Sequence, residues 1–467
     1  MEPNVCLRAN KQDVELLKLQ DREVLNFASL NSDCMQLIFE HLKWQDLVNV
    51  VETCKSFNDA ACAVFKRKLS GYRGMVLGRE RMKFEESKLF IMSRLMSFKV
   101  LRNFGHTLSG LHLYLDVGVA RYMNEYCSES MEELSFHFCD LRMSDIKKPF
   151  KNVKTIEMIG CRLYDQLAMF SDELFPNLRS LKLKGNFYFE PLIVHQMPKL
   201  LQLSFTPHSE GQSSGPNRLV DENDIIVLIK NIPQVEVLQL QLHENHGHRI
   251  LQCISKHLPS LRELNLIVYD QSVVLGDTQE SLRFDNVEDF RLSTYINTLL
   301  SRNPFIFKKL KSFNAINWTF DADCINSFFG KNKSLSSFDI HYGPISMECL
   351  ELTNVLRNLE EFRLYNVIDI PIVPLLNSFK QSPRLKKIFI RGRNEASSYQ
   401  TIRNAITLSG VKFNEKTRDV TGFIPINVLE FFIKNSQDSI LRSVLDILED
   451  SSTHNVSIMW YCGKVVK

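Results

Sequence analysis

Apolar residues recur along the middle of the chain in one fixed pattern, apolar-x-x-apolar-x-apolar. Leu178, Leu181 and Leu183 form a clear copy of it. Ten of the eleven steps between successive first positions are 22 to 26 residues long, and the remaining step is 35. So steady a period predicts a stack of similar units rather than one globular core. The first positions are Leu108, Met131, Val153, Leu178, Leu200, Val235, Leu261, Val287, Leu310, Leu335, Leu359 and Leu385.

Segments with a different periodicity separate these copies. Residues 224–230 and 250–257 carry apolar side chains at helical spacing, and Pro259 stands shortly before the next copy. The long step contains the polar stretch 208–216, which predicts an inserted loop. Each unit is therefore a predicted strand, turn and helix, and this order resembles that of leucine-rich-repeat proteins. The resemblance implies an α/β solenoid over residues 108–410, a horseshoe of about 12 repeats with parallel strands on the concave face and helices outside.

Candidate binding residues lie between the inward-facing apolar positions of each predicted strand. Side chains alternate along a strand, so these residues would face the concavity. The last repeats offer arginine and aromatic residues, which are enriched at protein-binding hot spots. The alternative is that they are ordinary solvated side chains. The candidates for substrate binding are Lys182, Lys184, Arg363, Tyr365, Phe389 and Arg391.

A helical module precedes the repeats, within residues 25–70. Its apolar spacing predicts three short amphipathic helices with starts near Ser32, Asp46 and Asn58. A unit of this size has a marginal core of its own, so its apolar surface favours a protein partner. A helical cap that only seals the first repeat is the alternative.

The order of residues in this module resembles the F-box family. The family's usual Leu-Pro opening is Leu30-Asn31 here, and Phe57 stands where the family commonly has tryptophan. The resemblance implies contact with a Skp-type ligase adaptor, although it does not separate contact residues from core residues. Those at or near the contact would be Leu30, Met35, Ile38, Phe39, Leu42, Leu47 and Val51.

The two resemblances together imply a substrate-recognition subunit of an SCF-type E3 ubiquitin ligase. Its partners would be the Skp-type adaptor, through it a cullin-RING core, and a protein target on the repeats. Such a subunit is not itself an enzyme and needs no cofactor, because it acts by bringing the target close to the ubiquitin carrier. The alternative is a leucine-rich-repeat scaffold outside any ligase, with a helical N-terminal cap.

Three further segments complete the predicted organisation. Residues 1–24 are an N-terminal extension. Residues 71–107 are a basic helical linker, with helical spacing over residues 89–96. Residues 411–467 are a divergent C-terminal repeat or cap, with a helix over residues 426–449 and a strand from Val456 to Tyr461.

Composition excludes several other functions. The net charge of +3 does not favour nucleic acid or a membrane surface as a partner. None of the 11 cysteines stands in a C-x-x-C pair, which fits a cytoplasmic or nuclear location. No nucleotide-binding or hydrolase motif occurs. Three histidines between His243 and His248 could hold a metal, but an exposed loop is the stronger interpretation, so we expect no metal site.

Overall fold

The computed structural model describes residues 30–69, 74–78, 88–91, 94–114, 119–142, 146–163, 171–185, 197–206, 222–242, 247–268, 281–300, 305–320, 322–342, 358–367, 384, 387–392, 412–414, 419–421 and 429–433. The chain divides into two units. Unit 1 comprises Met1–Lys154, Cys161–Asp165 and Glu173–Pro176, and unit 2 comprises Thr155–Gly160, Gln166–Asp172 and Asn177–Lys467.

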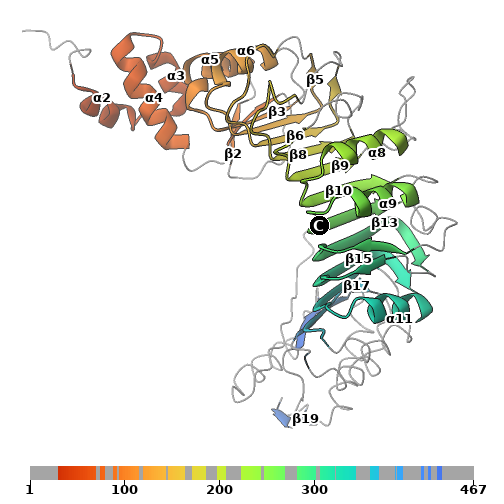
Figure 1. The fold of residues 1–467 in the computed structure, drawn as a ribbon. Coiled ribbons are helices and arrows are strands. Elements are labelled where there is room, and N and C mark those ends of the chain that lie inside the picture. The colour runs from red at the N-terminus through yellow and green to blue at the C-terminus, as the bar shows by residue number, and fades with distance from the viewer. Residues whose placement is uncertain are drawn as a thin grey trace, which may run out of the picture. The chain divides into compact units, whose positions relative to one another are not determined.

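Three helices form the first described part of unit 1, as predicted. They are α2 (Ser32–Phe39), α3 (Trp44–Val50) and α4 (Lys55–Leu69) (Figure 1). Asn31 fixes the start of α2, because its Oδ1 accepts a hydrogen bond of 2.8 Å from the backbone N–H of Cys34. The helices α3 and α4 begin two and three residues before the starts indicated by the apolar spacing.

Two strands precede the first predicted repeat of unit 1. Strand β1 (Gly74–Gly78) pairs in parallel with β2 (Lys88–Ile91) and with β3 (Gly110–Tyr114), and β3 pairs with β4 (Glu133–His137). The helix expected over residues 89–96 is therefore wrong for residues 89–91, which belong to β2. The linker is not wholly helical. Pairing overrides the local periodicity because it buries Met75, Val76, Leu77 and Ile91. Unit 1 also contains α5 (Arg94–Phe104), the 3₁₀ turn Gly105–Thr107, α6 (Val119–Cys127), β5 (Asp140–Leu141) and β7 (Arg162–Leu163).

Unit 2 contains ten further predicted repeat strands, so all twelve strands form where the apolar pattern places them. Neighbouring strands pair in parallel and in chain order. The fold is thus an α/β solenoid of the leucine-rich-repeat type, as predicted. Its strands are β6 (Thr155–Ile159), β8 (Ser180–Lys184), β9 (Gln202–Thr206), β10 (Val237–Leu242), β11 (Glu263–Val268), β13 (Asp289–Leu300), β15 (Ser312–Phe320), β16 (Ser337–His341), β17 (Glu361–Val367) and β18 (Lys387–Gly392).

Helices cover one face of these strands. Figure 1 shows α8 (Glu222–Asn231), α9 (Gly247–His257) and α11 (Ala322–Lys331) on the same side of the unit 2 sheet. The apolar positions of the repeats from β6 to β16 point to that side and are buried, as are Leu359 and Phe362 of the next repeat. The alternate positions lie on the other side, which we call the open face.

A ladder of phenylalanines runs through the later repeats under the helices. Each occupies the second apolar position of its repeat and is buried. Phe290 and Phe313 stack with ring centres 5.4 Å apart, as do Phe313 and Phe338, and Phe362 follows at 5.6 Å from Phe338. Aromatic pairs at these distances add to the energy of burying the rings, so the ladder is a main source of cohesion between repeats.

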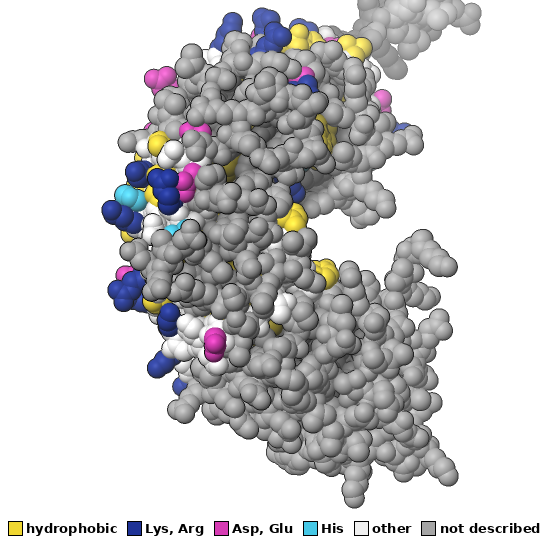
Figure 2. Space-filling view, turned by 90° about the vertical axis from the view of Figure 1, so that its right-hand side faces the viewer, with side chains coloured by type: hydrophobic (Ala, Val, Ile, Leu, Met, Phe, Trp, Pro, Cys, Tyr) yellow, Lys and Arg dark blue, Asp and Glu magenta, His cyan; other side chains and the backbone are white. Residues whose placement is uncertain are grey.

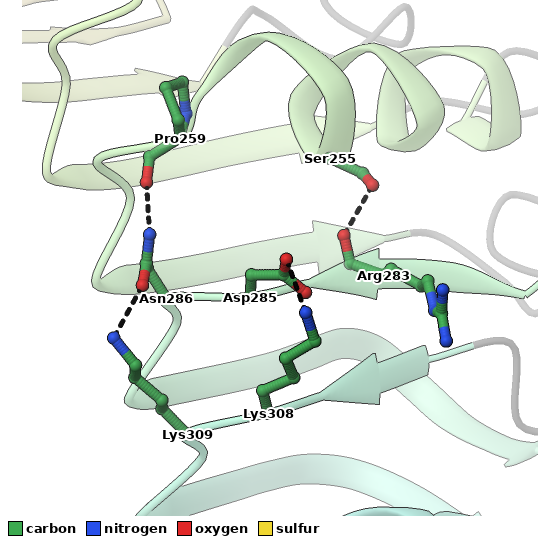
Figure 3. A network of polar contacts seen from close by, with 7 residues as sticks. All are labelled: Ser255, Pro259, Arg283, Asp285, Asn286, Lys308 and Lys309. Atoms are coloured by element: carbon green, nitrogen blue, oxygen red, sulfur yellow. Dashed lines mark hydrogen bonds and ion pairs between the residues drawn. The ribbon is translucent and has the colours of Figure 1, made fainter.

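Side chains at the start of each repeat connect it to the repeat before. The Nδ2 of Asn286 donates to the carbonyl oxygen of Pro259 at 2.7 Å, and its Oδ1 accepts from Lys309 Nζ at 2.8 Å (Figure 3). Lys308 forms an ion pair with Asp285 at 2.8 Å in the same place. Asn358 repeats this arrangement, since it donates to Lys333 and accepts from Arg384. The asparagine directly before the first apolar position thus joins three successive repeats.

A left-handed backbone recurs at one position of the repeat. The five described residues with positive φ all lie seven positions after the first apolar residue of their repeat. Two of them are glycines, Gly160 and Gly185, which adopt this conformation without strain. The others are Asn317, Tyr342 and Phe138, with φ of 61°, 61° and 54°. A bulky aromatic residue is strained there.

The C-terminal segment differs from the prediction. Strand β21 (Leu429–Ile433) pairs in parallel with β18, within residues 426–449 that were expected to be helical. Pairing with a preceding apolar strand again overrides a local helical spacing. Strands β19 (Lys412–Asn414) and β20 (Asp419–Thr421) form an antiparallel pair, and β12 (Leu282–Phe284) pairs with β14 (Phe305–Phe307). The strand expected from Val456 to Tyr461 and the loop expected at 208–216 lie outside the described residues.

Candidate functional site

The helical module separates its apolar residues into a core and an exposed surface. Met35, Phe39, Leu47 and Val51, four of the seven expected adaptor contacts, are buried inside the module. Phe57 holds Phe39 in place, with an edge-to-face ring contact at 5.6 Å. These four side chains therefore stabilise the module and present little surface to another protein.

The remaining apolar surface lies on α2. Ile38 is 40% exposed, and its neighbour Leu37 is 63% exposed. Leu30 and Leu42, at the two ends of this segment, are half-buried. The apolar periodicity does not predict Leu37 as a contact residue, because Leu37 stands off the i, i+3, i+4 face that identifies the helix. Two adjacent aliphatic side chains held open to water favour a docking role.

Polar contacts fix the position of α2 within the module. Arg67 of α4 forms an ion pair of 2.9 Å with Glu40 and donates to Gln36 at 2.8 Å. Lys68 donates to the Glu40 carbonyl oxygen, one of the acceptors that a helix end leaves open. Arg67 and Lys68, at the end of α4, thus hold α2 against α4 within the module.

A second set of contacts connects the module to α5. Lys99 pairs with Glu52 at 3.0 Å, and this cation lowers the pKa of the Glu52 carboxyl group. Phe65 of α4 stacks on Phe104 of α5 with ring centres 3.9 Å apart. The base of the module is therefore packed onto α5.

The open face carries the first two expected substrate-binding residues. Lys182 and Lys184 are exposed on β8, and Lys182 forms an ion pair with Glu157 of β6. This pair gives the open face a mixed charge here, and on the side of the molecule drawn in Figure 2 basic side chains likewise gather along one edge with acidic side chains among them. Mixed charges of this kind are typical of a protein-binding or solvated surface rather than of a nucleic-acid groove.

Arg363 is held by its own chain. It pairs with Glu361 at 2.6 Å and with Asp339 of the neighbouring strand at 3.8 Å. The strand register sets Arg363 beside Phe389 and Tyr365 beside Arg391, so the four positions are adjacent. The side chains of Tyr365, Phe389 and Arg391 lie outside the described part of the structure, and the cluster remains a prediction.

Two titratable groups of β16 are perturbed on this face. Burial raises the pKa of Asp339 to about 6, against the opposing effect of Arg363. Burial, with a smaller effect of Arg291, lowers the pKa of His341 to about 4. His341 is therefore neutral at physiological pH and can act as a hydrogen-bonding aromatic group rather than a cation.

Groups suited to covalent chemistry are placed poorly for it. Ser135 Oγ and His137 Nε2 share a hydrogen bond of 2.7 Å, the spacing of a nucleophile and its base. However, Ser135 is only 1% exposed, so its hydroxyl is not open to a substrate. Burial raises the pKa of the Cys62 and Cys127 thiols to about 11 and about 12, which keeps both protonated and unreactive.

Only one histidine of the histidine-rich stretch, His248, lies among the described residues. His248 lies in α9, where it is buried and hydrogen-bonded to Gln252 at 3.2 Å. His243 and His246 lie outside the described ranges. Within those ranges there is no group of three metal-binding side chains and no helix that is both long and apolar enough to cross a bilayer.

Comparisons with known proteins give structural likeness only. No protein-family model and no curated protein matches the chain. The chain is similar to one from the crystal structure of the Rad7 and Elc1 complex in yeast, with a TM-score of 0.34 and 12% identity over 92% of this chain and 96% of that one. It is also similar to a chain of the TLR13–ssRNA13 complex, with a TM-score of 0.35 and 16% identity over 73% of this chain and 51% of that one. At TM-scores below 0.5, neither likeness carries a functional argument.

Proposed function

We propose that the chain is the non-catalytic substrate-recognition subunit of an SCF-type E3 ubiquitin ligase. The helical module would bind a Skp-type adaptor, and the repeats would bind the protein target. The observation that carries the proposal is the exposed pair Leu37 and Ile38 on a helix that follows the F-box residue order. We place the adaptor contact on this pair, flanked by Leu30 and Leu42, with Met35, Phe39, Leu47 and Val51 supporting it from the core.

The mechanism is one of proximity. Binding a target beside a charged ubiquitin carrier turns a bimolecular encounter into an effectively intramolecular reaction. Rigid tethering raises the effective concentration of the target lysine. The stacking of Phe65 on Phe104 and the pairing of Lys99 with Glu52 would provide such rigidity at the base of the module. Location in the cytoplasm or nucleus, where such ligases work, is part of the proposal.

The alternative, a scaffold whose helices only cap the repeats, fits the described contacts less well. A cap must cover the exposed edge of the first repeat. In unit 1 the edge of the first repeat strand, β3, is already paired with β1, and β1 in turn with β2. These strands cover that edge, so the helices are not needed for it.

Co-purification with a Skp-type adaptor tests the proposal. The double variant Leu37→Asp/Ile38→Asp should lose the adaptor, since central interface residues each contribute about 2 kcal/mol, or roughly 30-fold in affinity. Both side chains are exposed, so the module should keep its helical circular dichroism. Val227→Asp, which alters an equally exposed residue of α8, is the matched control and should retain the adaptor. An adaptor that stays bound to the double variant would overturn the proposal.

A further inference from the structure

The open face of β11, β13, β15 and β16 is layered by chemistry. The strand register arranges its positions in rows that cross the strands. The first row is acidic and hydroxylic, the second rich in amides, and the third partly aliphatic. The acidic row is Glu263, Asp289, Ser312 and Ser337; the amide row is Asn265, Arg291, Asn314 and Asp339; the aliphatic row is Ile267, Ser293, Ile316 and His341.

The acidic row places two carboxylates side by side. Glu263 and Asp289 are register partners on adjacent parallel strands, and both are exposed. Like charges opposite each other across strands destabilise a sheet. Partial burial raises the pKa of Asp289 and the adjacent Glu288 adds to this, against the opposing effects of Ser312 and Lys311. The chain as a whole is positive, so this negative site is a local feature. A cationic group from a partner would relieve the repulsion.

The amide row contains hydrogen-bond acceptors that are not used. Within the described part of the chain, Asn265 Oδ1 and Asn314 Oδ1 are buried and accept no hydrogen bond. Leaving a buried acceptor without a donor costs about 1–3 kcal/mol. The two asparagines flank Arg291 in the row, and the Arg291 side chain is exposed. This row therefore also favours a partner that brings donors.

An exposed aromatic residue borders the aliphatic row. Tyr295 of β13 is 58% exposed, and its hydroxyl lies 3.4 Å from Gln241 Oε1 on β10. The side chain thus reaches across β11, the strand between them. Ile267 and Ile316 of the aliphatic row are half-buried. Tyrosine is a frequent anchor of protein interfaces because it offers a large rigid surface with a polar end.

We propose that this part of the open face binds an extended segment of a protein that runs along the strands, in which a lysine or arginine stands four residues from an aliphatic side chain, as Glu263 stands from Ile267. The basic group would meet Glu263 and Asp289, backbone or side-chain N–H groups would reach Asn265 and Asn314, and the aliphatic side chain would pack near Tyr295. The inference rests on the proposed function only in identifying this partner as the ligase target. An extended segment suits the site because its alternate side chains can address different rows.

Binding of labelled peptides to the full-length chain tests this inference. The probes are three pools of nine-residue peptides that are random except for a leucine four residues after a lysine, a glutamate or a serine (the Lys-Leu, Glu-Leu and Ser-Leu pools). Fluorescence anisotropy measures their binding. The Lys-Leu pool should bind tightest. The double variant Glu263→Gln/Asp289→Asn should weaken it about tenfold, as expected for loss of a charge pair with a cationic group. Tyr295→Ala should weaken it too, whereas Tyr295→Phe, which keeps the ring, should not.

A matched control removes the same charge elsewhere. Glu132→Gln/Glu133→Gln alters two exposed acids in unit 1, one of them at the repeat position of Glu263, and should leave peptide binding unchanged. The site variant should melt no lower than the wild type, because it relieves a like-charge pair. Equal binding of the Lys-Leu and Glu-Leu pools, or a site variant that binds like the control, would overturn the inference. Adaptor co-purification is measured separately. If the chain binds the peptides as expected but does not bind the adaptor, only the ligase assignment is overturned.

Discussion

Replacing Phe313 by alanine is expected to destabilise unit 2 more than any change on the open face. The ring is 2% exposed and lies between Phe290 and Phe338, each with its ring centre 5.4 Å away. Phe328 of α11 contacts it from the helical side at 4.6 Å. Truncation removes the buried ring and leaves a cavity that the neighbouring rings, which also include Phe320, cannot readily fill, because each is buried in packing of its own. We expect a loss of about 4 kcal/mol in the free energy of unfolding.

Urea unfolding followed by the fluorescence of Trp318 measures this loss locally. Trp318 is buried in β15, the same strand as Phe313. A background that carries Trp44→Phe and Trp460→Phe leaves it as the single tryptophan of the chain. Phe138→Ala, which truncates an exposed ring, is the control and should change the unfolding free energy by less than about 0.5 kcal/mol. A loss below about 1.5 kcal/mol for Phe313→Ala would refute the idea that the ladder holds the repeats together.

Two further predictions concern strain and pH. Phe138→Gly should stabilise unit 1 by about 1 kcal/mol in chemical denaturation, because glycine removes the strain of φ 54° at a position where other repeats have glycine; an unchanged or lower stability would contradict this. The pKa of Asp339 is raised from 3.8 to about 6, so the folded chain binds this proton more tightly than the unfolded chain, and stability should fall as pH rises from about 4 to about 6. Asp339→Asn should remove that part of the slope, by at most about 3 kcal/mol over the window, and identical pH profiles of the urea midpoint would argue against a raised pKa.

The repeats were predictable because apolar residues recur both at a fixed spacing within each strand and at a nearly constant interval along the chain. Leu264 and Leu266 mark a strand by the same spacing as their counterparts in every other repeat, and burial follows from that spacing. Strand β1 offers no such signal, since Met75, Val76 and Leu77 are consecutive apolar residues that are all buried. A continuous apolar run is compatible with a buried strand or a buried helix, and only its pairing with β3 decides.

The candidate sites were predictable in type but not in detail. A helical face built from Met35 and Phe39 looks the same whether it packs on its own module or on a partner, so the sequence could not place Leu37 as the most exposed apolar residue of α2. Arg363 was identified by residue type as a binding residue, but its two acidic neighbours come from strand pairing that the sequence does not display. The rows of the open face follow from the register, in which equivalent positions of successive repeats pair whatever the length of the segment between them, but the burial of each side chain in a row appears only in the structure.

The two faces of unit 2 show how the same strands can serve stability and binding separately. Side chains alternate along each strand, so a residue such as Phe338 packs under the helices while its neighbour Asp339 belongs to the opposite face. The packed face draws its cohesion from apolar burial and ring stacking. The open face keeps arrangements that lower the stability of the fold. Among them are the two carboxylates of Glu263 and Asp289, which lie on neighbouring strands. The packed face supplies the cohesion between repeats, so the open face can tolerate these destabilising arrangements. They mark the places where a bound partner would contribute most to the free energy of binding.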